Sequence, residues 1–228
     1  MEQQLRSDRS EWSRGPIITL DIETGVCASS VSSMRSAPQR PLSHFVLNEV
    51  RAAAALIFIT EGEGATFSLH SVDGADEAAN LQFVEELLNQ HPDAAVLTFN
   101  GHRHDLPVLE IRALRQAMFD AKGLRTLQRR HHYGLLQVLG GHCSLDSYLS
   151  ALRIGGLNMR PFPGRSTSAR VRKCEYDVVA TFLGFSNLMT FRAGAPEILL
   201  RHWRLLREYL LRPGIGRPHL ANLFDAID

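Results

Sequence analysis

Residues 16–24 read PIITLDIET, and this stretch decides the fold that we expect. A short apolar run such as PIITL is typical of a buried β-strand. Asp21 and Glu23 follow at its end, and since side chains alternate along a strand with a period of two, both carboxylates project from one face. Two carboxylates this close repel each other unless a cation lies between them. A triplet of this kind also occurs at ordinary strand ends that meet solvent, so further acids are needed to indicate a metal site.

The strand patterns that follow predict a mixed α/β sheet. Residues 52–60 and 65–72 are apolar or alternating, and the turn EGEG between them is typical of a hairpin. A helix is expected over residues 76–90, capped at its N-terminus by Asp76. Another buried strand, residues 94–99, comes next. Two hairpin-linked strands and a βαβ-like unit together indicate one sheet flanked by helices.

The second half of the chain has a helical pattern. Residues 123–156 are expected to form helices in two pieces, with Ser144 as the N-cap of the second. The Pro, Gly and Ser content of residues 158–170 predicts a loop. Helices are then expected from about Val171 and again over residues 196–211.

Length and composition favour one globular domain. The chain has 228 residues, of which 44% are apolar, enough to bury a normal core. We expect residues 1–15 to be a polar, flexible lead-in and residues 16–228 to form the domain. No stretch of about 18 apolar residues is present, so we expect no membrane partner. The cysteines are odd in number and scattered, which favours a reducing, cytoplasmic setting over disulfides: Cys27, Cys143 and Cys174.

Positive charge is concentrated in one segment of a nearly neutral chain. Residues 122–173 contain ten lysines and arginines and a single acid, Asp146, for a formal charge of +9, whereas the whole chain carries +1. Such a segment suits a phosphate backbone, whose affinity for proteins is mainly electrostatic. The alternative is a solvated helical face that pairs with acids elsewhere.

Two further acids strengthen the prediction of a metal site. Asp105 follows the strand at 94–99 and begins a helix, which places it at a strand's carboxyl end, the usual location of sites in open α/β sheets. Asp177 lies in a helical stretch beside the apolar Val178 and Phe182. An acid in such surroundings is costly to bury unless it is paired or bound to a metal. A salt bridge to an arginine would explain Asp177 taken alone.

Three stretches in this order resemble the motifs of a known family: ITLDIET (18–24), FNGHRHDLPVL (99–109) and CEYDVVATF (174–182). They are similar to the successive motifs of DnaQ-like, DEDD-type 3′–5′ exonucleases, and most of all to the group described as predicted polymerase-B-like 3′–5′ exonucleases. The ending RPHLANLFDA also resembles that group. The resemblance implies an RNase H-like fold with a mixed five-stranded sheet flanked by helices and a helical C-terminal half.

The resemblance also implies a reaction and a set of site residues. The family removes nucleotides from the 3′ end of single-stranded nucleic acid, for which we expect DNA rather than RNA, by two-metal-ion phosphodiester hydrolysis with Mg²⁺ or Mn²⁺. The positions that match its metal-binding acids are Asp21, Glu23, Asp105 and Asp177. The positions expected near the substrate are Thr24, Asn100, His104 and Arg172.

The sequence departs from the family at the residue expected to handle the attacking water. The family has a histidine five residues before the last acid or a tyrosine four residues before it, and Arg172 and Lys173 occupy those positions. Tyr176 is adjacent to Asp177, and one residue is a rotation of about 100° on a helix, so it should face elsewhere. Lys173 can act catalytically as a base or as a cation on the phosphate. It can also form a simple i,i+4 ion pair with Asp177, and in a third interpretation the chain is a weak or inactive nucleic-acid-binding module.

The histidines carry a weaker signal. Pairs of the H-x-H and H-H type without cysteines rarely indicate zinc, so a zinc site is disfavoured. His104 stands where the family usually has an aromatic residue. We expect it to pack beside the site in that role, and its use as a base is the lesser alternative.

Overall fold

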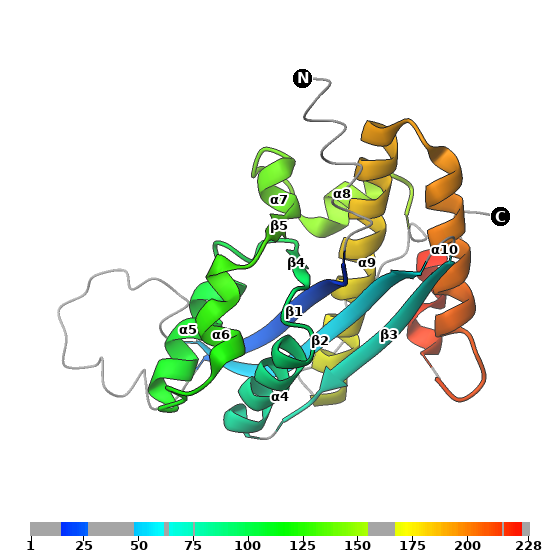
Figure 1. The fold of residues 1–228 in the computed structure, drawn as a ribbon. Coiled ribbons are helices and arrows are strands. Elements are labelled where there is room, and N and C mark those ends of the chain that lie inside the picture. Colours follow the sequence, from blue (N-terminus) through cyan, green and yellow to red (C-terminus); the bar gives the residue numbers. More distant parts are fainter. Residues whose placement is uncertain are drawn as a thin grey trace.

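The computed structural model describes residues 15–26, 48–61, 64–74, 76–154, 167–215 and 217–224. These residues build one five-stranded sheet in the order β3-β2-β1-β4-β5 (Figure 1). The strands are β1 (Ile17–Val26), β2 (Asn48–Glu61), β3 (Gly64–Val72), β4 (Ala95–Thr98) and β5 (His132–Gly134). β1, β2 and β3 pair antiparallel, whereas β4 is parallel to β1 and β5 is parallel to β4. The mixed five-stranded sheet expected of an RNase H-like fold is therefore confirmed.

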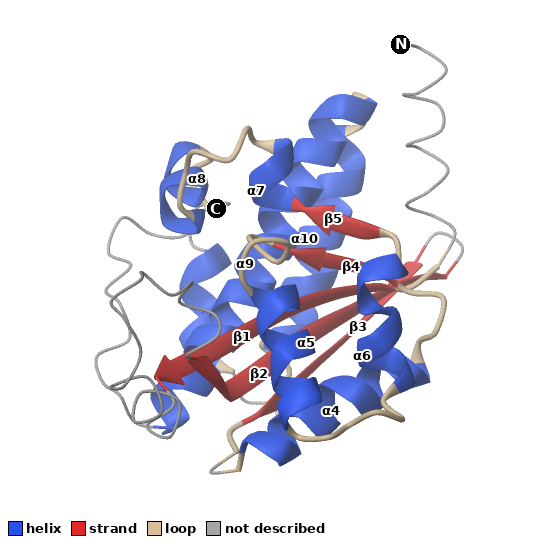
Figure 2. Ribbon diagram, turned by 90° about the vertical axis from the view of Figure 1, so that its left-hand side faces the viewer, coloured by secondary structure: helices blue, strands red, loops and turns tan. Residues whose placement is uncertain are grey.

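Helices cover both faces of the sheet, as Figure 2 shows. One face carries α4 (Glu77–Gln90), α5 (Asp105–Arg115), α6 (Lys122–Thr126) and the short η1 (Leu127–Arg129). The other carries α7 (Leu135–Val138), α8 (Leu145–Ala151), α9 (Thr167–Ala193), α10 (Pro196–Leu210) and η2 (Pro218–Phe224). No helix in the described part of the chain is long and apolar enough to cross a membrane.

The two faces of β1 point into two separate apolar cores. Ile18, Leu20 and Ile22 pack in the core beneath α4 and α5, and all three are buried. Ile17 belongs to the core beneath α9 and α10. Because side chains alternate along a strand, the odd-numbered positions of β1 face α9, and these positions include Asp21 and Glu23.

Several local signals act as the sequence predicts. The Asp76 side chain caps α4 by accepting a hydrogen bond from the backbone N–H of Ala78 at 3.1 Å. Ser144 caps α8 in the same way through the N–H of Ser147. Pro196 occupies the first turn of α10, where its missing N–H costs nothing.

Three boundaries differ from the sequence-based expectation. Residues 132–134 form strand β5 and not part of a helix, because they pair with β4 at the sheet edge. The predicted loop at 158–170 is wrong for residues 167–170, which form the first turn of α9, since this part of the segment contains neither Pro nor Gly. Residues 25–41 are rich in Ser, Arg and Pro, a composition that predicts a loop, yet Gly25 and Val26 continue β1 because they pair with β2. The expectations for residues 1–14, 27–47 and 155–166 lie outside the described residues.

Candidate metal centre

The register of the sheet explains why the two acids of β1 lie in an open position. β1 pairs with β4 only as far as Thr19, which lies opposite Leu97, and β4 ends at Thr98. Asp21 and Glu23 therefore lie beyond the carboxyl end of β4, where the chain turns away toward α5. This edge of a parallel strand pair is the usual location of ligand sites in open α/β sheets.

Small residues on β2 let α9 approach the sheet at the acids. Ala54 lies opposite Asp21 in the register and Ala52 lies opposite Glu23, and both alanines are fully buried. They share one core with Val178 of α9. Because a methyl side chain takes little room, the helix can bring its own polar residues close to β1.

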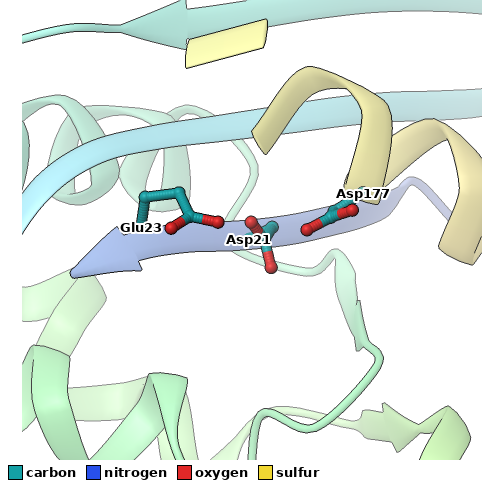
Figure 3. A group of neighbouring side chains, drawn as sticks. All are labelled: Asp21, Glu23 and Asp177. Carbon is teal, nitrogen blue, oxygen red and sulfur yellow. The ribbon is translucent and has the colours of Figure 1, made fainter. Parts of the chain in front are cut away.

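Asp21 and Glu23 of β1 and Asp177 of α9 form one acidic cluster (Figure 3). Each contributes a carboxylate oxygen, and these three oxygens lie within 4.8 Å of one another. In the view of Figure 3, Asp21 lies between the other two. Asp177 is more than 150 positions from either acid of β1 in the sequence, so the fold creates this cluster.

Burial and mutual repulsion both oppose ionisation in the cluster. Burial, followed by the charges of Asp177 and Asp105, raises the pKa of Asp21 well above its usual value. Burial also raises the pKa of Asp177 to about 6, although Lys173 acts in the opposite direction. Oδ2 of Asp21 is buried and has no hydrogen-bond partner among the described residues. A buried carboxylate oxygen without a donor is costly, so this atom is suited to a cation.

Lys173 lies directly against the acids. Its Nζ donates to Oε1 of Glu23 and to Oδ2 of Asp177, the latter at 2.7 Å. Burial disfavours the charge, but Asp177 and Glu23 outweigh it and raise the pKa of the lysine. The i,i+4 pair with Asp177 that the spacing allows is therefore present, and it extends to β1. A raised pKa favours a permanent cation at this position over a general base.

Asp105 lies beside the cluster and is engaged by its neighbour. It is buried at the start of α5, and its Oδ1 accepts a hydrogen bond from Nδ1 of His104 at 2.9 Å. That hydrogen bond, against the opposing effect of burial, raises the pKa of His104. Asp105 does not belong to the group of three whose oxygens converge, yet its charge raises the pKa of Asp21. His104, at the position where the family usually has an aromatic residue, forms a polar pair with Asp105.

A turn held by hydrogen bonding connects the end of β4 to Asp105 at the start of α5. The Thr98 hydroxyl accepts a hydrogen bond from the backbone N–H of Gly101 at 2.9 Å. A Cβ atom on Gly101 would collide with the Thr98 side chain, so the turn requires glycine here. Oδ1 of Asn100, in the same turn, is buried without a hydrogen-bond partner among the described residues.

The other two expected substrate residues differ in placement. Thr24 follows Glu23 directly, after an irregularity in the β1–β2 register, and is half-buried. Arg172 is exposed, and its Nε donates to the backbone carbonyl of Ser168 at 3.2 Å, back along its own helix. The structure thus places Thr24 next to the acids and turns Arg172 along α9.

Two neighbours of the cluster were not anticipated from the sequence. Burial is the largest cause of the raised pKa values of Asp177 and Tyr176, and the charge of Asp146 on α8 raises both further. The Cys174 thiol is fully buried, and burial, followed by the charge of Asp21, raises its pKa. No sequence signal identifies these contacts, because they depend on where α8 and α9 dock.

Among the described residues, no histidine belongs to a group of three side chains that could hold a metal ion together. His102 and His132 hydrogen-bond to each other, with Nε2 and Nδ1 2.7 Å apart. Burial, followed by the charges of His102 and His131, lowers the pKa of His132 to about 4. The acidic cluster fits a hard cation better, because Mg²⁺ and Mn²⁺ prefer carboxylate oxygens and Oδ2 of Asp21 needs a partner.

Similarity to known proteins is found at the level of structure and not of sequence. No family model matches the chain, and no curated protein matches it either. Among solved structures, the chain is similar to the family B DNA polymerase from the hyperthermophilic archaeon Pyrobaculum calidifontis, with a TM-score of 0.49 and 14% sequence identity. The match covers 88% of this chain but only 29% of that polymerase chain.

The electrostatics of Asp177 predict how metal binding depends on pH. In the folded protein the pKa of Asp177 is about 6, above its ordinary value. The protonated carboxyl therefore contributes to the stability of the fold at low pH, and this contribution is lost as the pH rises through about 6. A bound divalent ion reverses this penalty, because it favours the ionised carboxylates. Mn²⁺ should therefore raise the melting temperature clearly at about pH 7.5 and much less at about pH 5.

Thermal melting with Mn²⁺ and with chelator at the two pH values measures this difference. The Asp177→Asn variant is the matched control, since it should show a smaller dependence on pH. An equal shift at both pH values in the native protein would contradict the account.

Proposed function

We propose that the protein is a metal-dependent 3′–5′ exonuclease that acts on single-stranded nucleic acid, DNA rather than RNA. One observation carries the proposal: carboxylate oxygens of Asp21, Glu23 and Asp177 converge within 4.8 Å on a mixed sheet of the RNase H-like kind. The same three acids occupy the family's motif positions in the expected order. A structural role alone does not account for three acids that repel one another around an oxygen without a partner.

The chemistry divides between the cation site and the chain's own residues. Divalent ions, when bound, supply a clamp on the scissile phosphate, an activated water and stabilisation of the leaving 3′ oxygen. Asp21, Glu23 and Asp177 would hold them, with Asp105 alongside. Lys173 places a positive charge at the edge of the site, where it would attract the phosphate.

We assign substrate contacts to four residues around this centre. Thr24 and the Asn100 amide lie on the segments next to the acids, so they would contact the terminal nucleotide. His104 would position Asp105 through their hydrogen bond. Arg172 would contact the phosphate backbone only after its side chain turns away from Ser168.

The positive segment at residues 122–173 supports a nucleic-acid substrate. Arg125 and Arg129 are exposed, so phosphates can reach their guanidinium groups, although one nitrogen of Arg125 also donates to the carbonyl of Phe119 at 3.0 Å. Arg130 differs, because its guanidinium donates to the carbonyls of His91 and Leu88 at 2.7 Å each and so holds the fold. Phosphate attraction of this kind does not distinguish DNA from RNA, so the preference for DNA rests on the family resemblance.

A second function is favoured by one observation. The Lys173 ammonium already bridges Glu23 and Asp177, so the acids are partly neutralised without a metal. A module that binds single strands without cutting them would be compatible with this ion pair. The two functions differ in whether a divalent cation leads to cleavage.

A gel assay on 5′-labelled single strands tests the proposal. DNA and RNA oligonucleotides are incubated with Mg²⁺ or Mn²⁺ and with chelator. The expected result is a ladder of progressively shorter 5′-labelled products that appears only with metal and faster on DNA. Retained binding without metal-dependent shortening of either strand would reject the exonuclease in favour of the binding module.

A further inference from the structure

The ammonium of Lys173 lies where a cation of the acidic cluster would be expected. It contacts two of the three converging carboxylates, Glu23 and Asp177, which come from different elements of the fold. Half of its side chain is still exposed, so it reaches the acids from the solvent side along α9. The contact is therefore more than a pair within one helix, because it links α9 to β1.

The charges of the cluster set how many divalent ions it can accept. The three converging carboxylates and the Lys173 ammonium leave a net formal charge of −2 when all are ionised, with Asp105 paired separately to His104. One divalent ion neutralises this charge, whereas two would leave an excess positive charge in a partly buried site. Excess charge of one sign in such surroundings is costly.

The carboxylate oxygens that are still without a partner also favour a single divalent ion. Oδ2 of Asp21 is buried without a partner, whereas an oxygen of Glu23 and one of Asp177 are already bonded to Lys173. Oδ1 of Asp105 is taken by His104. Asp21 is therefore the acid at which an added cation gains most.

The type of side chain also matters. An ammonium is a compact point charge with three donors, so it can occupy a position between oxygens much as a metal ion does. A guanidinium is planar and forked, so it favours paired hydrogen bonds and is a poorer substitute for a point charge. The chain contains 23 arginines but only two lysines, Lys122 and Lys173, and one of the two lies at this position.

We propose that the Lys173 ammonium takes the place of one of the two divalent ions that the family resemblance implies, so that the centre binds a single divalent ion, at Asp21. The inference rests on the proposed metal centre and replaces the expected two ions by one ion and one built-in cation.

The test counts Mn²⁺ ions bound per chain. Free Mn²⁺ is measured by electron paramagnetic resonance while the metal-free protein is titrated, with and without a nucleoside 5′-monophosphate as a mimic of the product. The expected count is one for the native protein and two for Lys173→Met, which removes the charge but keeps much of the side-chain length. Lys122→Met is the matched control, because it removes the chain's other lysine, which is exposed on α6, and should leave the count at one.

The outcomes separate this inference from the proposed function. Two ions in the native protein overturn the inference and leave the metal centre intact. No bound ion overturns both. One ion in the native protein and also in a folded Lys173→Met variant shows that Lys173 is not the reason and overturns the inference as well. The native count decides even if Lys173→Met fails to fold.

Discussion

Replacing Asp21 by asparagine should abolish metal-dependent shortening of a nucleic-acid strand while leaving the protein folded. In metal sites, loss of a residue that only hydrogen-bonds to a ligand lowers metal affinity or activity by about 10- to 100-fold. Loss of a ligand itself should therefore lower the activity by more than about 100-fold. Oδ2 of Asp21 is the buried oxygen that lacks a partner, which makes it the atom most in need of a cation.

The same substitution should stabilise the metal-free protein. Burial and neighbouring charges raise the pKa of Asp21, so its ionised form is disfavoured in the folded state. A neutral asparagine removes that penalty at neutral pH. A higher melting temperature together with lost activity distinguishes a removed ligand from a damaged fold.

Initial rates on a 5′-labelled strand and thermal melting measure the two effects. Asp146→Asn is the control, because Asp146 is an exposed acid of α8 that influences Asp177 without joining the converging three. It should retain most of the activity. Similar activity in Asp21→Asn and the native protein would show that the acidic cluster is not the catalytic centre.

The largest expected effect on stability comes from Arg112 of α5. Its side chain is 2% exposed, and its Nε and Nη2 donate to the carboxylate of Glu77 at 2.7 and 2.5 Å. Glu77 also accepts a hydrogen bond from the backbone N–H of Val50 at 2.8 Å, so the pair ties α5 and α4 to β2. Arg112→Ala leaves a largely buried carboxylate without its cation and should cost about 3–5 kcal/mol of unfolding free energy.

Chemical denaturation of Arg112→Ala measures this loss. Arg115→Ala on the same helix is the control, because Arg115 is exposed and surface contacts of an arginine contribute at most about 1 kcal/mol to the unfolding free energy. Equal stabilities of the two variants would mean that the pair does not hold α5 in place. Since α5 begins at Asp105, a loosened helix should also lower the activity.

The sheet and most helices could be predicted from local pattern. The apolar run around Ile18 and Leu20 predicted a strand, and the period of two predicted that its acids share one side. Asp76 and Ser144 marked helix starts that the structure has. Strand β5 could not be predicted, because three residues are too few to show alternation. Its pairing with β4 is a long-range contact that a single sequence does not reveal.

The acids of the centre could be predicted as residues but not as a geometry. Motif order indicated Asp21, Glu23 and Asp177, and the structure brings these three together. Asp105 lies outside this group, after a turn that is held by the contact between Thr98 and Gly101, and no sequence pattern indicates that contact. Spacing predicted an ion pair between Lys173 and Asp177, whereas the contact with Glu23 joins residues 150 positions apart and follows only from the docking of α9 on β1.

Anomalous diffraction from a crystal soaked in Mn²⁺ tests most directly the claim that the acidic cluster is a divalent metal centre. We expect an anomalous peak among Asp21, Glu23 and Asp177, in contact with an oxygen of Asp21. The same soak of Asp21→Asn should lose the peak. A native crystal without a peak at this position, with Lys173 still bridging Glu23 and Asp177, would contradict the claim.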